Sequence, residues 1–213
     1  MAPPRAAPKR AYHHGDLRPA LIAAAVHILE AEGEAALTLR AVARQVGVSQ
    51  AAPYHHFADK HAILSAVGEE GFVHLATAME EAKATAGKKP RDVLRAMGVA
   101  YVRFAVKHPS HFRVMFSGIL AVGEECGTLH DAANRAFGLL LMSVADAQQA
   151  GVLVDGDPAK LALYSWSMVH GLVMLHLNGL TDGPAGPLGS IEELAAGAAE
   201  AIARGLEKKT SRA

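Results

Sequence analysis

The sequence predicts an all-α fold, with a small N-terminal unit of three helices followed by a larger helical body. Of its 213 residues, 51% are hydrophobic and only 5% are aromatic, a balance that favours helices over packed sheets. Apolar residues recur at spacings of three and four, and glycine or proline interrupts these runs. We therefore expect a basic arm at residues 1–14, a three-helix domain at 15–62 and a helical body at 63–209.

The first three helices are predicted from their end signals. Asp16 can cap the first helix and Gly33 can end it. Thr38 can cap a short second helix, which closes at Gly47, where a left-handed backbone is favourable. Ser49 can cap a third helix only two residues later. Two helices joined by so few residues around a glycine have the sequence pattern of a helix-turn-helix.

Pro53 constrains the third helix. With Ser49 as cap, Pro53 stands where the first backbone N–H of the helix would be bonded, and proline has none. We expect a tight or 3₁₀-like first turn there. Pro53 and Phe57 lie four residues apart and can face the first two helices, which directs Gln50 and Tyr54 outward.

Periodic apolar residues predict further helices in the body. They are expected at about 61–86, 93–107, 108–116, 128–150, 158–180 and 191–206. Ser190 and Glu193 can form a capping box at the start of the last helix. Residues 181–189 predict a glycine- and proline-rich loop, and no segment has the alternation expected of a substantial strand.

Charge and cysteine content indicate the partner and the cellular compartment to expect. The net charge is zero, but the first sixty residues carry seven Lys and Arg against five Asp and Glu, a mild excess that weakly supports a nucleic-acid partner. The single cysteine, Cys126, excludes an intrachain disulfide and fits a reducing compartment. The N-terminus lacks the apolar core of a signal peptide. We therefore expect a cytoplasmic protein.

One uncharged run, residues 161–181, is long enough to span a membrane. Polar residues interrupt it, and no basic cluster follows closely to anchor it. We interpret it as a buried core or dimer helix and expect no membrane association.

Three ordered motifs carry a family resemblance. They are YHHGDLR at 12–18, LTLRAVARQVGVS at 37–49 and PYHHFADKHAIL at 53–64. In this order they closely resemble the TetR family of bacterial transcriptional regulators. The resemblance implies a three-helix DNA-binding head on a larger all-helical body, a homodimer, and release from DNA when a small molecule enters the body.

Transferred position by position, the resemblance places a recognition helix at 49–57. The implied DNA-contacting residues are Thr38, Arg40, Ser49, Gln50, Ala51, Tyr54, His55, His56 and Lys60. Hydroxyl donors and a helix N-terminus suit phosphate oxygens, and a glutamine amide can pair with an adenine edge. Ala51 offers only a methyl group, so base readout depends on few side chains. No metal is expected at His55 and His56, because neighbours on a helix point about 100° apart.

The body carries a second, weaker resemblance. HPSHFRVMF at 108–116 and ALYSWSMVHGL at 162–172 resemble TetR-type ligand-binding domains with a Trp-His-Gly element, interrupted here between Trp166 and His170. The helical face of these two residues can contact a ligand or pack the core or dimer seam. The candidate pocket residues are Phe104, Phe112, Met115, Phe116, Phe137, Met142, Trp166 and His170. Because the body has no cluster of one charge, we expect a mainly hydrophobic or aromatic ligand.

These patterns predict a ligand-responsive regulator, expected to be a repressor, that binds a palindromic operator in double-stranded DNA and leaves it when a small hydrophobic effector binds. Dimerisation is expected through the helices at 158–180 and 191–206, and no cofactor is expected. The alternatives are an architectural or activating DNA-binding protein without effector, and a helical enzyme. We expect no enzyme, because the sequence has no nucleophile motif, phosphate loop or metal-spaced cluster.

Overall fold

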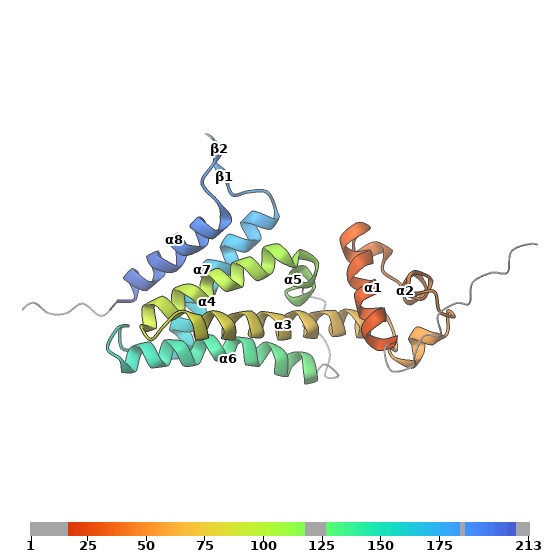
Figure 1. The fold of residues 1–213 in the computed structure, drawn as a ribbon, viewed down its shortest axis with the longest axis horizontal. Helices are drawn as coiled ribbons and strands as arrows, with labels where there is room; N and C mark the ends of the chain where they lie inside the picture. The colour runs from red at the N-terminus through yellow and green to blue at the C-terminus, as the bar shows by residue number, and fades with distance from the viewer. Residues whose placement is uncertain (1–16, 118–126, 184–185, 208–213) are drawn as a thin grey trace, which may run out of the picture. The chain divides into compact units, whose positions relative to one another are not determined.

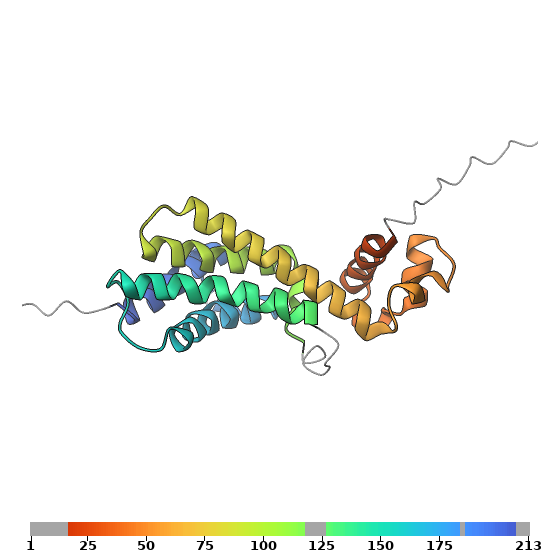
Figure 2. The ribbon, with the colours of Figure 1, turned by 90° about the horizontal axis from the view of Figure 1, so that it is seen from below.

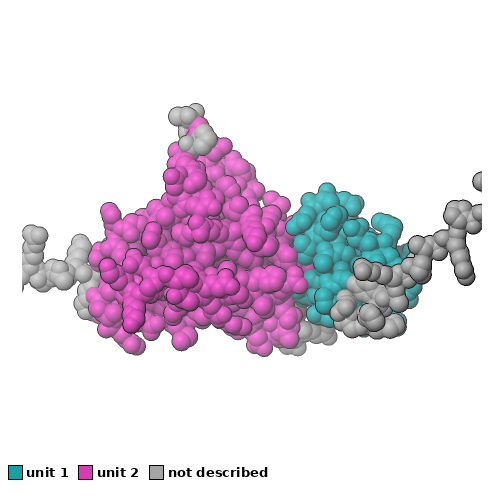
Figure 3. Space-filling view, viewed as in Figure 1, with its two compact units in different colours: residues 1–66 teal, residues 67–213 magenta. Residues whose placement is uncertain are grey.

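The computed structural model describes residues 17–117, 127–183 and 186–207, and these residues form an all-α protein (Figure 1). The predicted fold class is therefore confirmed. The chain divides into two compact units between Ala66 and Val67 (Figure 3). Asp16 and Cys126 lie outside the described residues.

The N-terminal unit has two α-helices and two 3₁₀ turns. In chain order they are α1 (Leu17–Ala31), η2 (Glu34–Ala36), α2 (Leu39–Val46) and η3 (Ala52–His55), followed by the first residues of α3 (Lys60–Thr85). Leu21 and Ala25 of α1 and Val42 of α2 are fully buried. The apolar spacing read from the sequence therefore faces α1 and α2 toward one another.

The ends of α2 follow the predicted signals. The Thr38 hydroxyl accepts a hydrogen bond from the Ala41 N–H at 3.0 Å, as expected of an N-cap. Gly47 has φ 79° and ψ 29°, a left-handed conformation that costs glycine little, and its N–H donates to the Ala43 carbonyl. Both predictions are confirmed. They fix where the chain leaves α2 and enters the exposed turn described below.

The body consists of helices and one minimal hairpin. Besides the rest of α3, it contains α4 (Pro90–Lys107), α5 (Pro109–Met115), α6 (Gly127–Gln149), α7 (Pro158–Leu177), β1 (Asp182–Gly183), β2 (Gly186–Pro187) and α8 (Ile191–Gly205). The two antiparallel strands lie within the expected glycine- and proline-rich loop. α7 ends three residues earlier than predicted, and Gly179 follows with φ 69°. The capping box at Ser190 and Glu193 is confirmed.

Helix α4 forms the centre of the body and packs against α6, α7 and α8 (Figure 1). α3 and α6 lie side by side in both views (Figure 1, Figure 2). Polar pairs join them, including Arg135 with Glu80 at 2.9 Å and Lys83 with Ser143 at 3.2 Å. This arrangement leaves the apolar faces of five helices directed at one another. Among the described residues, no helix is long and apolar enough to cross a membrane.

Candidate functional site

Residues 50–57 form an exposed turn after α2, and its backbone differs from the predicted helix. Only a 3₁₀ turn forms, over Ala52–His55, and the Ser49 side chain makes no cap. The Ser49 carbonyl instead accepts from the Ala52 N–H at 3.0 Å. The expected tight turn at Pro53 is confirmed, but the α-helix capped by Ser49 was wrong. Pro53 has no N–H to donate, so the α-helical hydrogen-bond ladder is missing its bond there.

The side chains of the exposed turn divide into an apolar wedge and an outer face. Pro53 and Phe57 are buried, and the Arg18 guanidinium lies 5.5 Å from the centre of the Phe57 ring. This anchor keeps the turn on the helices that precede it. The outer face consists of exposed residues Gln50, Ala51, Tyr54, His55 and His56. Five of the residues expected to contact DNA are thus exposed on this one turn.

The other four expected contacts flank the turn. Thr38, Arg40 and Ser49 are exposed, although the Thr38 hydroxyl is engaged as the cap of α2. Lys60 is only partly exposed: its Nζ donates to the Glu34 carbonyl at 2.8 Å and lies 3.3 Å from the Glu34 carboxylate. Part of its charge is therefore neutralised by Glu34, so Lys60 should bind a phosphate more weakly than a fully solvated lysine would.

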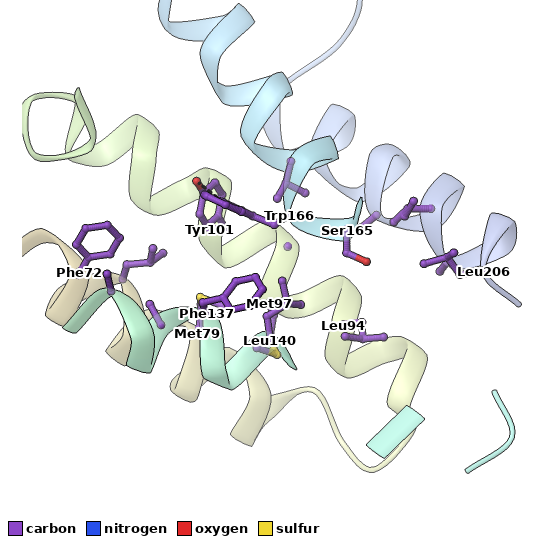
Figure 4. Close-up of a pocket in the computed structure, with 18 of the residues that line it drawn as sticks. Phe72, Met79, Leu94, Met97, Tyr101, Phe137, Leu140, Ser165, Trp166 and Leu206 are labelled. Atoms are coloured by element: carbon purple, nitrogen blue, oxygen red, sulfur yellow. Dashed lines mark hydrogen bonds between the residues drawn. The ribbon is translucent and has the colours of Figure 1, made fainter. Parts of the chain in front are cut away.

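The body contains an apolar cavity of about 260 Å³ (Figure 4). Its wall comes from α3, α4, α6, α7 and α8, together with Phe116 after α5 and Leu153 between α6 and α7. Phe72 lies at one end and Leu206 toward the other, with Met79, Met97 and Phe137 between them (Figure 4). Apolar walls with few polar groups are typical of sites that bind small organic molecules.

A chain of three polar side chains lies at the cavity wall. The Trp166 indole N–H donates to the Tyr101 hydroxyl at 3.0 Å, and this hydroxyl lies 2.8 Å from Nδ1 of His170. Burial raises the pKa of Tyr101 far above its usual value, against a smaller lowering by the Trp166 hydrogen bond. Burial also lowers the pKa of His170. The phenol is therefore neutral, and it can donate its one proton to the neutral imidazole.

Not all predicted pocket residues face this cavity. Phe116, Phe137 and Trp166 line it, and His170 reaches it only through Tyr101. The other four lie elsewhere in the body, namely Phe104, Phe112 and Met115 in the packed core and Met142 on the surface. Met142 is 63% exposed because five positions after Phe137 carry it around α6 to the side away from the cavity.

Sequence reasoning missed much of the cavity wall. Phe72, Leu75 and Met79 on α3 and Ala199 and Leu206 at the far end of the chain all contribute. Their apolar periodicity predicted a buried helical face, but the same pattern fits ordinary core packing. Tyr101 carried the one available signal, a phenol placed within an otherwise apolar stretch of a predicted helix.

Comparison with known proteins gives two family matches that together cover most of the chain. Residues 21–67 match the family of bacterial regulatory proteins called the tetR family, and residues 94–199 match the tetracyclin repressor-like C-terminal domain. These segments contain the exposed turn and most of the cavity wall, respectively.

Individual relatives are similar to the chain over most of its length. A solved protein of unknown function from Rhodococcus sp. RHA1 is 34% identical and superposes with a TM-score of 0.83, covering 94% of this chain and 100% of its own. The TetR family transcriptional regulator PfmR from Thermus thermophilus is 26% identical, with a TM-score of 0.68 over 88% of this chain and 99% of its own. An uncharacterized HTH-type transcriptional regulator of Mycobacterium tuberculosis is 26% identical over 78% of this chain and 72% of its own.

Proposed function

The chain belongs to the TetR family of bacterial transcriptional regulators, and we propose that it is a repressor released from its operator by a small, mainly hydrophobic effector. It is a DNA-binding regulator, and its family points to regulation rather than catalysis. One observation supports the proposal above others. The same chain presents a polar, exposed turn in one unit and an apolar cavity in the other.

The outer face of the exposed turn has the chemistry for DNA. Tyr54 and Ser49 offer hydroxyl donors suited to phosphate oxygens, and the Gln50 amide can pair with an adenine edge in the major groove. His55 and His56 add donors on the same surface. Because Ala51 provides only a methyl group, we assign most of the base discrimination to Gln50.

The cavity favours an uncharged ligand. Its volume of about 260 Å³ is near the lower end of the usual range for small-molecule sites. The Tyr101 oxygen accepts from Trp166, and the Tyr101 O–H can donate to His170, so these groups neither repel an apolar molecule nor supply a charge. An ionised ligand would lose its hydration without gaining a counter-charge from the wall. We therefore assign the cavity to a small neutral compound, apolar or aromatic.

The switch requires no chemical step. An effector that binds more tightly to a conformation unable to grip the operator shifts the population away from DNA. A difference of about 1–3 kcal/mol in binding free energy between the two conformations weakens DNA binding roughly 5–150-fold. α3 provides a continuous connection, because it starts at Lys60 in the N-terminal unit and continues to Thr85 along the cavity.

We assign dimerisation to α7 and α8. α7 carries a set of exposed apolar side chains, namely Leu163, Tyr164, Met168, Met174 and Leu175. Exposed apolar surface of this extent is characteristic of an interface. A two-fold dimer would present two exposed turns to half-sites about 34–36 Å apart. In sedimentation at micromolar concentration, Met168→Glu should weaken the dimer, whereas Met142→Glu on exposed α6 should not; a monomeric native chain would refute the assignment.

The experiment that tests the DNA assignment is selection of bound fragments from random DNA, followed by titration of variants. We expect a palindrome whose half-sites lie about one helical turn apart. Tyr54→Phe should weaken binding to all sequences if its hydroxyl meets phosphate, whereas Gln50→Ala should relax preference at one base position. Equal losses for Gln50→Ala on selected and random DNA would reject its reading role.

The effector assignment needs a separate test, because an architectural or activating DNA-binding protein would also select a palindrome. Neutral aromatic compounds should release the native protein from its selected site. Ala133→Phe places a large ring in the cavity wall and should keep DNA binding while losing this response. Release that is unchanged in Ala133→Phe would place the effector elsewhere, and the absence of release by any such compound would favour the architectural alternative.

A further inference from the structure

Three potential metal-binding side chains meet where α3 packs against α5. Glu70 and His74 lie one turn apart on α3, and His111 lies on α5. One ligand atom of each lies within 4.8 Å of the ligand atoms of the other two. Glu70 is partly buried, His74 is exposed and His111 is buried. The cluster is therefore packed against the protein at His111 and accessible to solvent at His74. It lies apart from the residues that line the cavity.

Gly71 explains why the two helices come so close at this point. A Cβ atom at this position would lie 2.5 Å from Met115 Sδ and 3.3 Å from the Cβ of His111. Any larger residue at this position would have to displace the Met115 side chain, so glycine allows α5 to approach to this separation without a rearrangement. The consequence is that Nε2 of His111 lies 3.1 Å from Oε1 of Glu70, with His74 on the next turn of α3.

The environment of His111 is unusual for a histidine that serves only packing. Its Nδ1 atom is buried and has no hydrogen-bond partner among the described residues, whereas most buried polar atoms have one. No protein group therefore fixes the tautomer through Nδ1. The carboxylate of Glu70 can only accept, so Nε2 of His111 carries the proton of their hydrogen bond. Metal binding at Nε2 therefore requires the ring proton to shift to Nδ1, an atom that no described residue occupies with a hydrogen bond.

We infer that Glu70, His74 and His111 form a binding site for a divalent transition-metal ion such as Zn²⁺. Two imidazoles and one carboxylate suit first-row transition metals, whereas Mg²⁺ and Ca²⁺ prefer oxygen ligands alone. Glu70 and His111 already lie 3.1 Å apart, a separation compatible with two ligands each about 2.0–2.1 Å from one Zn²⁺ ion, so any closing of the site on loading falls to His74. His74 is exposed and can make this movement.

The remaining coordination position faces solvent. His74 and His108 both line a surface groove between α3 and α4. The His108 ring centre lies 6.3 Å from that of His74 and 5.8 Å from that of His111. Three protein ligands with the fourth position open to water are a known arrangement of zinc in proteins, found in its catalytic sites. The groove gives a metal ion a route to the cluster without opening the core.

Metal binding would give the regulator a second input, and this consequence rests on the proposed function. The ion would tie α3 to α5 within the body. α3 begins at Lys60, three residues after the end of the exposed turn at Phe57. A change in the position or rigidity of α3 is therefore a physical means by which the metal can alter operator affinity.

The site is tested on the full chain without an affinity tag, stripped of metal by a chelator and titrated with Zn²⁺ by calorimetry. We expect one tightly bound ion per chain, and Co²⁺ should bind competitively with a visible absorption spectrum of tetrahedral type. His74→Ala and Glu70→Gln should each weaken binding at least about 10-fold, the loss that even an outer-shell partner can cause. His130→Ala, which removes an exposed histidine on α6, and Glu81→Gln, which replaces an exposed acid on α3, serve as matched controls.

Because His74 is exposed, its replacement should leave the circular dichroism spectrum unchanged. His111→Ala removes a buried side chain, so a loss of binding in that variant could also come from a change in the core. Absence of stoichiometric Zn²⁺ binding, or equal affinity in the native chain and His74→Ala, overturns the site. Operator titrations with and without Zn²⁺ then test the second input: a shift lost in His74→Ala supports it, and no shift overturns it. Failure to bind any operator would count against the proposed function and leave the calorimetric result standing.

Discussion

Two tyrosines show how differently the exposed turn and the cavity wall are built. Tyr54 is 53% exposed, and its hydroxyl makes no hydrogen bond to another described residue. Tyr101 is 4% exposed, and its hydroxyl is bonded to both Trp166 and His170. A surface that meets phosphates must keep its donors available, whereas a cavity for a neutral molecule must satisfy its polar groups internally.

The difference shows that binding and stability depend on separate side chains in the exposed turn and on the same side chains in the cavity wall. The outer face of the exposed turn can be altered without disturbing the wedge of Pro53 and Phe57 beneath it. In the cavity wall, the groups that shape the site also hold helices together. Changes in the turn should therefore act on DNA binding alone, and changes in the wall should act on stability and ligand response together.

The largest expected effect contrasts Phe112→Ala with Tyr54→Ala. The Phe112 ring is fully buried and lies against Tyr101, Phe116 and His170, with ring centres 5.7, 4.8 and 5.5 Å away. Its truncation should lower the free energy of unfolding by about 3–5 kcal/mol. Tyr54→Ala should change it by no more than about 0.5 kcal/mol. Urea denaturation followed by circular dichroism measures both, and a large loss in Tyr54→Ala would contradict the division between the two regions.

A second, smaller effect is expected from Tyr101→Phe. The substitution keeps the ring and removes only the hydroxyl, which leaves the Trp166 N–H and His170 Nδ1 without their partner. The cost should be about 1–3 kcal/mol in the free energy of unfolding, as for other buried groups left unpaired. Tyr54→Phe is the matched control, because Tyr54 is exposed on the turn and its hydroxyl makes no hydrogen bond to another described residue. Equal stability of the two variants would show that the polar chain contributes nothing to the wall.

The sequence could predict the features that depend on near neighbours. Thr38 as a cap, the left-handed Gly47 and the tight turn at Pro53 each follow from the chemistry of one residue and the few around it. The buried positions of Pro53 and Phe57 followed from their spacing. The same reasoning failed at Ser49, because the effect of Pro53 on the backbone extended over the whole turn and left no α-helix to cap.

The cavity could not be predicted in the same way. Its wall combines residues from Phe72 to Leu206, and no local pattern states which buried helical face meets a void and which meets another side chain. Phe112 and Phe116 illustrate this, since they lie one turn apart on or just after α5 and only Phe116 reaches the cavity. The Glu70, His74 and His111 cluster has the same origin, because helix packing alone brings its third member to the other two.

Two glycines of the body differ in how closely other side chains approach them, and replacing each with alanine tests how much helix packing depends on this. Gly71→Ala should lower the free energy of unfolding by about 1 kcal/mol, near the lower end for overpacking, because the Met115 side chain can yield. Gly138→Ala lies within α6 with no atom near the added methyl group and should raise it by up to about 1 kcal/mol. Thermal unfolding of the pair tests this, and stabilisation by Gly71→Ala would mean that α3 and α5 do not need so close an approach.

The smallest effect concerns pH and arises at His170, which is bonded to Tyr101 of the cavity wall. Burial lowers the pKa of His170 from 6.5, so as pH falls below that value the unfolded chain takes up a proton before the folded chain does. This proton uptake does not change the stability above pH 6.5, and it lowers the free energy of unfolding as pH falls toward the lowered pKa of the folded state. His170→Gln keeps a group that can accept from Tyr101 but cannot titrate, so its unfolding free energy should fall less steeply from pH 7 to pH 5. Identical slopes for the native chain and His170→Gln would show that the folded chain protonates His170 as easily as the unfolded chain does. The cavity wall would then tolerate a charge beside Tyr101, contrary to the neutral pairing described above.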